Sequence, residues 1–237
     1  MSTYLTSLNT AKARELAARY ALKIVEELEP KIIGLGTGRT TKKFIDLMIN
    51  ELDLSKYKFV ISSIDTLLYL TRKARIVIDP NANPDIYIDS ADEVDIGLNM
   101  IKGGGGALLR EKVLSQRSAY NVFIVDYNKL SERIGSKSPV PIEVVPNALN
   151  NVLIELRRLG FKAKLRMSKT RMGPTITDNN NYIMDVYIPP IDDPEGLDLK
   201  LKKITGVVET GLFYNIIDVL IVGYPNNVIR IQGSRRH

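Results

Sequence analysis

The chain has 237 residues, of which 44% are hydrophobic and 25% are charged, and its formal net charge is +6 at pH 7. This composition is typical of a globular protein and excludes a disordered or fibrous chain. The chain has no cysteine, which excludes disulfides, a thiol nucleophile and a cysteine-held metal. The single histidine, His237, lies in a tail over 233–237 that could be a cloning remnant or a native terminus. Any catalysis must therefore use carboxylates, lysines, hydroxyls and backbone amides.

The same sequence predicts the environment and the partners. No apolar run approaches the roughly 20 residues of a membrane span, and the first residues lack a signal-peptide pattern. We therefore expect a soluble, cytoplasmic protein with no membrane partner. Basic residues are scattered and not interleaved with aromatic ones, which argues against nucleic acid as a partner. The positive excess favours anionic small molecules.

The first half of the chain alternates between helical and β-rich segments. Apolar residues at helical spacing from Leu16 to Leu28 predict a helix that is capped by Asn9 or Thr10 and ends at Pro30. Further helices are predicted at 40–52, 66–72 and 107–118, and strands at 31–35, 59–61, 75–78, 85–89 and 121–125. Apolar strands separated by helices predict a parallel sheet covered on both faces. The fold class is therefore α/β, with an open Rossmann-like domain.

The pattern changes near residue 136. Predicted elements follow as strand 142–145, helix 148–159, strands 162–167 and 182–188, helix 195–204 and strand 207–210. This β-α-β-β-α-β order predicts a second, smaller ferredoxin-like α+β domain. Two remaining strands, 219–222 and 228–231, are expected to return to the first sheet. The predicted domains are therefore a discontinuous α/β catalytic domain (1–131 and 211–237) and a small α+β domain (132–210).

A glycine-threonine loop over 34–41 leaves a predicted strand and opens a predicted helix. Its glycines allow a tight turn in which successive amides and the helix N-terminus point at one anion. The hydroxyls of Thr37, Thr40 and Thr41 could add donors. The spacing fits neither the dinucleotide-binding nor the P-loop fingerprint. Anion binding and a βα turn that binds nothing therefore remain equal alternatives.

An acidic segment, Asp89 to Asp95, follows the fourth predicted strand and holds four acids in seven residues. Ligands of open α/β sheets lie beyond the carboxyl ends of the strands, where Asp89 and Asp92 are expected. The spacing does not fit a calcium loop, and no histidine is available, so we expect no metal. An Asp-capped loop is the alternative, but the number of acids favours a function.

Residues 102–112 form the most informative stretch, Lys-Gly-Gly-Gly-Gly-Ala-Leu-Leu-Arg-Glu-Lys. Four glycines can make a flexible linker, but this run lies inside the α/β pattern and directly before a helix. The glycines there favour close approach of the main chain to a ligand. Glu111 could face that ligand or be a solvated acid. Lys129 follows the fifth strand, where a lone lysine is usually a surface charge.

Together these stretches resemble the type A ribose-5-phosphate isomerase family. The family's glycine-threonine phosphate loop matches 34–40, and its Asp-Gly-Ala-Asp-Glu segment matches 89–93. Its long signature matches 102–112 without a change. Weaker similarities near 141–144, 177–179 and 206–213 extend the resemblance over nearly the whole chain.

The resemblance implies interconversion of D-ribose 5-phosphate and D-ribulose 5-phosphate in the pentose phosphate pathway, without metal or organic cofactor. It makes Glu111 the base that moves a proton between C2 and C1 through an enediolate. Asp89, Asp92 and Lys102 would handle ring opening, hydroxyl protons and the charge on the enediolate oxygen. It also suggests a homodimer or homotetramer. The residues expected to hold the substrate are Thr37, Gly38, Arg39, Thr40, Ser90, Ala91, Gly103, Gly104, Gly105 and Lys129.

Two positions depart from the family pattern. Arg39 stands where the family usually has serine, and Ser90 where it usually has glycine. Arg39 could strengthen phosphate binding through its charged fork or point away. Ser90 adds a Cβ where the backbone passes close to the substrate. Neither is a proposed proton-transfer group, so we expect effects on affinity more than on activity.

Two other classes of function remain open. One is a non-catalytic sugar-phosphate sensor, as in some transcriptional regulators, and the other is a neighbouring class of enzyme. The sensor would need a helix-turn-helix to read DNA, and residues 1–30 predict only one helix. A sugar-phosphate deaminase usually relies on a histidine. A CoA transferase of related architecture would use a glutamate nucleophile, for which Glu111 is the candidate. Binding without turnover would indicate the sensor, and a thioester at Glu111 the transferase.

Overall fold

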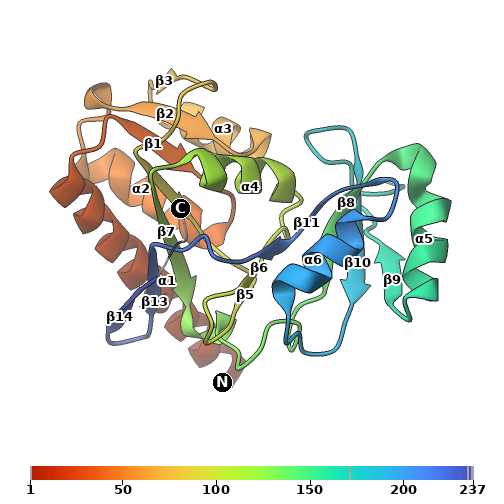
Figure 1. The fold of residues 1–237 in the computed structure, drawn as a ribbon. Coiled ribbons are helices and arrows are strands. Elements are labelled where there is room, and N and C mark those ends of the chain that lie inside the picture. Colours follow the sequence, from red (N-terminus) through yellow and green to blue (C-terminus); the bar gives the residue numbers. More distant parts are fainter. Residues whose placement is uncertain (1, 171, 234, 236–237) are drawn as a thin grey trace. The chain divides into compact units, whose positions relative to one another are not determined.

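Figure 1 shows the computed structural model of the chain, which describes residues 2–170, 172–233 and 235. The chain folds into two compact units. Unit 1 contains the residues up to Ala91, Arg110–Leu130 and the residues from Asn215 on, and unit 2 contains Asp92–Leu109 and Ser131–Tyr214. The division expected from the sequence placed 92–109, Ser131 and 211–214 in the first domain, whereas the structure groups them with unit 2.

Unit 1 is built on a seven-stranded sheet in the order β14-β13-β7-β4-β1-β2-β3. Neighbouring strands are parallel except β13 and β14, which are antiparallel. The predicted parallel sheet is confirmed, and so is the return of the last two strands to it. The strands are β1 (Ile32–Leu35), β2 (Lys58–Ile61), β3 (Val77–Ile78), β4 (Ile86–Asp89), β7 (Tyr120–Asp126), β13 (Val219–Gly223) and β14 (Val228–Gln232).

Helices α1, α2 and α3 of unit 1 bury apolar residues in a core with this sheet. The elements are α1 (Ser2–Leu28), α2 (Arg39–Glu51), α3 (Ile64–Thr71) and α4 (Leu108–Arg117), with short 3-10 helices η1 (Leu54–Lys56) and η2 (Tyr127–Lys129). Ala21 of α1 and Phe44 of α2 pack in one apolar core with Ile33 of β1. No helix within the described residues is long and apolar enough to cross a membrane.

The predicted start of α1 is wrong. The helix begins at Ser2, so that Asn9 and Thr10 lie inside it. The hydroxyl of Thr10 donates to the carbonyl of Thr6 at 2.9 Å, one turn back. This is how a threonine within a helix satisfies its side chain. The first turns escaped prediction because their residues show no clear apolar periodicity.

Unit 2 contains a four-stranded antiparallel sheet in the order β11-β8-β10-β9. Its elements are β8 (Val140–Val144), η3 (Pro146–Ala148), α5 (Leu149–Arg158), β9 (Lys162–Leu165), β10 (Tyr182–Tyr187), α6 (Pro194–Lys202) and β11 (Val207–Thr210). The predicted β-α-β-β-α-β order is confirmed. Ile142 and Met184 belong to the core that α5 and α6 cover. Glu143 and Asp185 alternate with them and therefore face the opposite side.

A small three-stranded sheet in unit 2 was not predicted. It has the order β12-β6-β5, with β5 (Glu93–Val94), β6 (Met100–Ile101) and β12 (Leu212–Phe213). Strands of two residues show no periodicity from which they could be predicted. β6 pairs with β5 inside 92–109 and with β12, and the pairing with β12 joins 92–109 to 211–214 within unit 2.

Candidate active site

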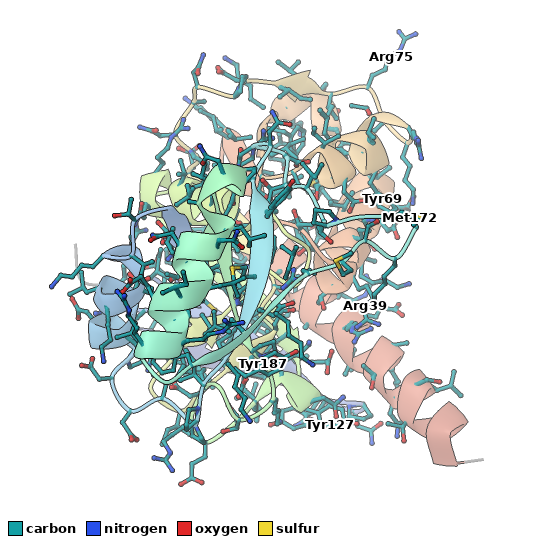
Figure 2. All side chains as sticks on the ribbon, turned by 90° about the vertical axis from the view of Figure 1, so that its right-hand side faces the viewer. Arg39, Tyr69, Arg75, Tyr127, Met172 and Tyr187 are labelled. Carbon is teal, nitrogen blue, oxygen red and sulfur yellow. The ribbon has the colours of Figure 1, made fainter. Side chains whose placement is uncertain are left out.

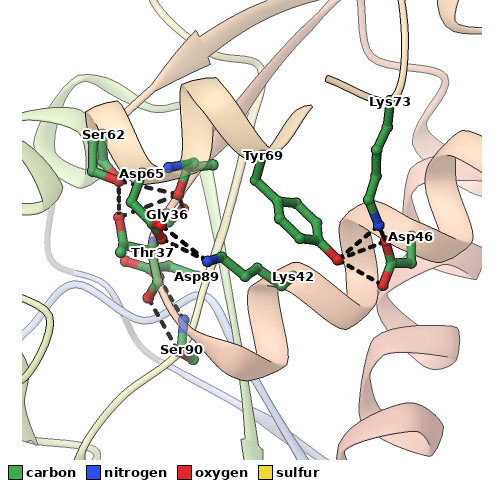
Figure 3. Close-up of polar contacts among 12 residues, drawn as sticks. Gly36, Thr37, Lys42, Asp46, Ser62, Asp65, Tyr69, Lys73, Asp89 and Ser90 are labelled. Atoms are coloured by element: carbon green, nitrogen blue, oxygen red, sulfur yellow. Dashed lines mark hydrogen bonds and ion pairs between the residues drawn. The ribbon is translucent and has the colours of Figure 1, made fainter. Parts of the chain in front are cut away.

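The loop after β1 brings its backbone close against Asp89, at the end of β4. The N–H of Gly36 donates to the carbonyl of Ile88 at 2.9 Å. The N–H of Thr37 donates to Asp89 Oδ1 at 3.0 Å; Figure 3 shows Thr37 and Asp89. A Cβ on Gly36 would lie 1.8 Å from Asp89 Cγ, so this approach requires glycine. The predicted phosphate loop is thereby fastened to a candidate catalytic carboxylate.

A cluster of hydroxyl groups surrounds Thr37 at the ends of β1 and β2. Thr37 Oγ1 donates to Ser63 Oγ at 2.6 Å and lies 3.0 Å from Ser62 Oγ (Figure 3). Thr66 Oγ1 donates to the carbonyl of Gly36 at 2.8 Å. Ser63 also caps α3 by accepting from the N–H of Thr66. The hydroxyl-rich end of β2 is therefore part of the same local structure as the glycine-threonine loop.

Asp89 is fully buried, and donors hold both of its oxygens. Besides the amide of Thr37, Oδ1 accepts from the N–H of Ser90 at 2.7 Å. Oδ2 accepts from the hydroxyl of Tyr87 at 2.5 Å. Thr41 Oγ1 lies 3.4 Å from Oδ1. Donors from several directions leave the carboxylate little freedom to rotate.

Tyr87 is a residue of this site that the sequence analysis missed. It is fully buried on the same side of β4 as Asp89, which follows two residues later. Burial raises the pKa of Tyr87 well above its ordinary value, and the negative charges of Asp89 and Glu111 raise it further. The phenol therefore stays protonated and donates to Asp89 over the ordinary pH range. The sequence carried no separate signal for it, because a tyrosine within a strand pattern looks like an ordinary core residue.

Glu111 lies in the first turn of α4 and is 3% exposed. This burial excludes the solvated surface acid that the sequence left open. A carboxylate in the first turn of a helix is stabilised by the helix dipole. The charge of Glu111 contributes to the raised pKa of Tyr87, so Glu111 lies near the Tyr87–Asp89 pair within unit 1.

Within unit 2, Asp92 contacts the turn formed by residues 103–106, which we call the glycine turn. The N–H of Gly106 donates to the carbonyl of Gly103 at 2.9 Å, which closes the turn. The N–H of Gly104 donates to Asp92 Oδ2 at 2.7 Å. Lys102, which precedes the turn, is 2% exposed, and its ammonium lies 5.5 Å from the centroid of the Phe213 ring. A buried ammonium over an aromatic face is a favourable cation–π arrangement.

The other predicted residues occupy varied environments. Arg39, labelled in Figure 2, begins α2 with an exposed side chain, whereas Thr40 next to it is buried. Ser90 is half-buried, and its hydroxyl lies 3.5 Å from the carbonyl of Thr37. Further positions are Gly38 at the N-cap of α2, Ala91 (buried), Gly105 (exposed) and Lys129 at the end of η2. Within the described residues no three His, Cys, Asp or Glu side chains gather as metal ligands would.

Comparison with known proteins identifies the family. The sequence pattern of the family described as "Ribose 5-phosphate isomerase A (phosphoriboisomerase A)" matches residues 58–227. The chain belongs to this family. It is therefore an isomerase, and the resemblance that its motifs indicated is confirmed.

Relatives of the ribose 5-phosphate isomerase A family match nearly the whole chain. Ribose-5-phosphate isomerase A of Pyrococcus abyssi is 41% identical over 230 residues, which cover 95% of this chain and 100% of that protein. A solved D-ribose-5-phosphate isomerase in complex with phospho-erythronic acid is 39% identical, with a TM-score of 0.89 and coverage of 94% of this chain and 99% of that chain. The ribose 5-phosphate isomerase A of Methanocaldococcus jannaschii gives 32% identity and a TM-score of 0.87, with the same coverage.

Proposed function

We propose that this isomerase interconverts D-ribose 5-phosphate and D-ribulose 5-phosphate through a cis-enediolate, with Glu111 as the general base. The names of its relatives support the pair of substrates. The observation that carries the assignment of the base is the burial of Glu111 in the first turn of α4, near the Tyr87–Asp89 pair. A general base has to be held in one place, and a buried carboxylate on a helix meets that need.

The proposed reaction moves one proton between two carbons. Glu111 removes the proton from C2 of the open-chain aldose, the electron pair forms a C1–C2 double bond, and the C1 oxygen takes the negative charge. Glu111 then returns the proton to C1, while the proton of the C2 hydroxyl is transferred to the C1 oxygen and C2 becomes the carbonyl. A positioned carboxylate of this kind typically contributes about 10²–10⁴-fold to the rate.

Other residues have proposed roles around this transfer. Lys102 and amides of the glycine turn stabilise the negative oxygen, because fixed donors act most strongly where charge develops. Asp89 and Asp92 exchange hydroxyl protons during ring opening and isomerisation. The relative that binds phospho-erythronic acid supports a site for a phosphorylated, anionic sugar derivative. The residues proposed to hold the substrate are Thr37, Gly38, Arg39, Thr40, Ser90, Ala91, Gly103, Gly104, Gly105 and Lys129.

The test is NMR of ribose 5-phosphate with the protein in deuterium oxide and excess EDTA, beside the variant Glu111→Gln. We expect the wild type to produce ribulose 5-phosphate with deuterium at the exchanging carbon. We expect Glu111→Gln to fold normally and to lose nearly all turnover and exchange. The matched control is Glu155→Gln, on another helix, whose carboxylate contacts Arg158 and should be dispensable.

Three other results of this test would contradict the proposal. Glu111→Gln turnover within about tenfold of the wild type would contradict the base, since general-base catalysis contributes more than that. A wild type that binds the sugar phosphate without turnover would indicate a sensor. A CoA thioester trapped at Glu111 would indicate a transferase.

A further inference from the structure

Arg166 lies directly after β9, and its backbone is fixed on both sides. Its N–H donates to the carbonyl of Ile183 at 2.8 Å, and its carbonyl accepts from the N–H of Thr175 at 2.8 Å. The side chain is 19% exposed. Its Nε donates to Asp185 Oδ2 at 2.9 Å, and Nη2 pairs with Asp185 Oδ1. The guanidinium therefore has one orientation, set by a two-pronged contact with a carboxylate of β10.

The third nitrogen of Arg166 contacts the glycine turn. Nη1 donates to the carbonyl of Gly103 at 2.8 Å and to the carbonyl of Gly104 at 3.1 Å. All of these residues belong to unit 2. One side chain thus connects the four-stranded sheet to two consecutive peptide groups of the turn that follows Lys102.

These two contacts decide which way the amides of the turn face. In a trans peptide the carbonyl and the following N–H point in opposite directions. With the carbonyl of Gly103 on Arg166, the N–H of Gly104 faces the other side, where it donates to Asp92 Oδ2 at 2.7 Å. With the carbonyl of Gly104 also on Arg166, the N–H of Gly105 faces away from the guanidinium. Gly105 is exposed, so a ligand can reach it.

A run of four glycines needs such an anchor, because glycine gains more conformational freedom than other residues when it is not held. Amides that must reorient at the moment of reaction stabilise a developing charge poorly, whereas fixed amides do so without reorganisation. A cation on the carbonyl oxygens also polarises the two peptide groups and strengthens their N–H groups as donors.

We infer that Arg166, oriented by Asp185, is a positioning residue that turns the amides of Gly104 and Gly105 towards Asp92 and the reacting oxygens of the substrate. This inference rests on the proposed function. Arg166 acts through the glycine turn and through Asp92. Its loss should therefore affect the chemical step more than the binding of the phosphate group.

The test measures kcat and KM for ribose 5-phosphate in Arg166→Gln. We expect kcat to fall about 100-fold, the cost of misplacing catalytic groups by roughly 1 Å, while KM changes little. Inhibition of Arg166→Gln by phospho-erythronic acid should weaken in proportion to the fall in kcat/KM. Inhibition by inorganic phosphate should stay as in the wild type. The matched control is Arg133→Gln, which removes the same charge from unit 2 at an exposed pair with Asp192 and should leave kinetics unchanged.

Two further variants keep the inference falsifiable if Arg166→Gln folds poorly. Arg166→Lys keeps the charge but lacks the planar fork that reaches Asp185 and both carbonyls together, so we expect kcat to fall with little loss of stability. Asp185→Asn should also lower kcat, and its combination with Arg166→Gln should be no worse than Arg166→Gln alone. A folded Arg166→Lys or Arg166→Gln protein at the wild-type rate would overturn the inference. A wild type without isomerase activity would overturn the proposed function as well, so the two failures are distinguishable.

Discussion

Asp89 shows how a single side chain orders the carboxyl end of the unit 1 sheet. The amide of Thr37 reaches it from the loop after β1, and the amide of Ser90 and the phenol of Tyr87 reach it from β4 and its end. Because these donors come from two neighbouring strands, the carboxylate fastens the glycine-threonine loop to β4. Removal of one donor should therefore weaken both the fold and the loop.

Tyr87→Phe removes one of these donors and keeps the ring. We expect the free energy of unfolding at pH 8 to fall by about 1–3 kcal/mol, because a buried carboxylate loses a hydrogen bond. Burial raises the folded-state pKa of Tyr87 above its ordinary value of 10.0, so this stabilisation is complete below pH 10 and is lost as the pH rises above it. Urea unfolding at pH 8 and above pH 10 should show the difference from the wild type shrinking.

The control for this prediction is Tyr69→Phe. The hydroxyl of Tyr69 also donates to a carboxylate, Asp46, but on the half-buried surface between α2 and α3 (Figure 3). Tyr69→Phe should cost less stability, since exposed pairs contribute little. A Tyr87→Phe loss that is the same at pH 8 and at pH 11 would contradict the argument.

At this scale the sequence could predict residues that stand at the ends of strands, because their chemical types are unusual there. Asp89 is an example, and the structure shows it buried. Glu111, in the first turn of α4, was a candidate only through the resemblance of 102–112 to a family signature. Tyr87 was not predictable in the same way, because a tyrosine within a strand is indistinguishable from an ordinary core residue. Arg166 is separated from the glycine turn by about 60 residues, and only the folded chain joins them.

At the scale of elements, the C-terminal end of α4 has a cap from a distant part of unit 1. Arg235 Nη1 donates to the carbonyl of Ser118 at 2.7 Å, and Nη2 donates to the carbonyl of Gln116 at 3.2 Å. Its guanidinium also lies 3.5 Å from Asp218. Basic groups at this end of a helix satisfy its last carbonyls and interact favourably with the dipole. Arg235 therefore contributes to the helix that carries Glu111, although the sequence left open whether 233–237 is a cloning remnant.

Arg235→Ala should lower the free energy of unfolding by about 1.5–3 kcal/mol, the range for hydrogen bonds from a charged donor. Urea unfolding at pH 7 measures this, and kcat should change little because Glu111 lies at the other end of α4. Arg230→Ala is the control, since Arg230 is an exposed arginine of β14 that donates to Gln232. Equal stability of the two variants would contradict the capping role.

Long elements were predictable and short ones were not. The sheet of unit 1 and the ferredoxin-like order of unit 2 follow from periodic apolar segments, and the structure confirms both. The two-residue strands β5, β6 and β12 form because β6 finds partners on both sides, which no local pattern records. Ile101 of β6 and Leu212 of β12 pack in the core of unit 2, and these contacts over long distances in the chain are why the boundary expected from the sequence differed there.

At the scale of the whole molecule, the pairing of β7 with β13 in unit 1 spans more of the chain than the pairing of β8 with β10 in unit 2. Val122 of β7 lies opposite Val219 of β13, whereas Ile142 of β8 lies opposite Met184 of β10. The first pairing closes a loop about twice as long, which costs roughly 0.6 kcal/mol, or about threefold in rate. Pulse-labelled hydrogen exchange during refolding should therefore show protection of β8 and β10 before the amides of β13 that pair with β7; those that pair with β14 close only a short hairpin. Protection of the β13 amides that pair with β7 first would contradict this.

The chain passes between the units four times, after Ala91, Leu109, Leu130 and Tyr214. Unit 1 is therefore encoded by three separate stretches of the gene and unit 2 by two. A recombination event that exchanged one unit for a homologous version would have to replace all of its stretches at once. Single crossovers instead produce chimaeras in which at least one unit is a mixture of two parents. A single crossover therefore cannot exchange one unit whole and leave the other intact. The same holds for the residues proposed for catalysis, Asp89 and Glu111 in unit 1 and Asp92 and Lys102 in unit 2.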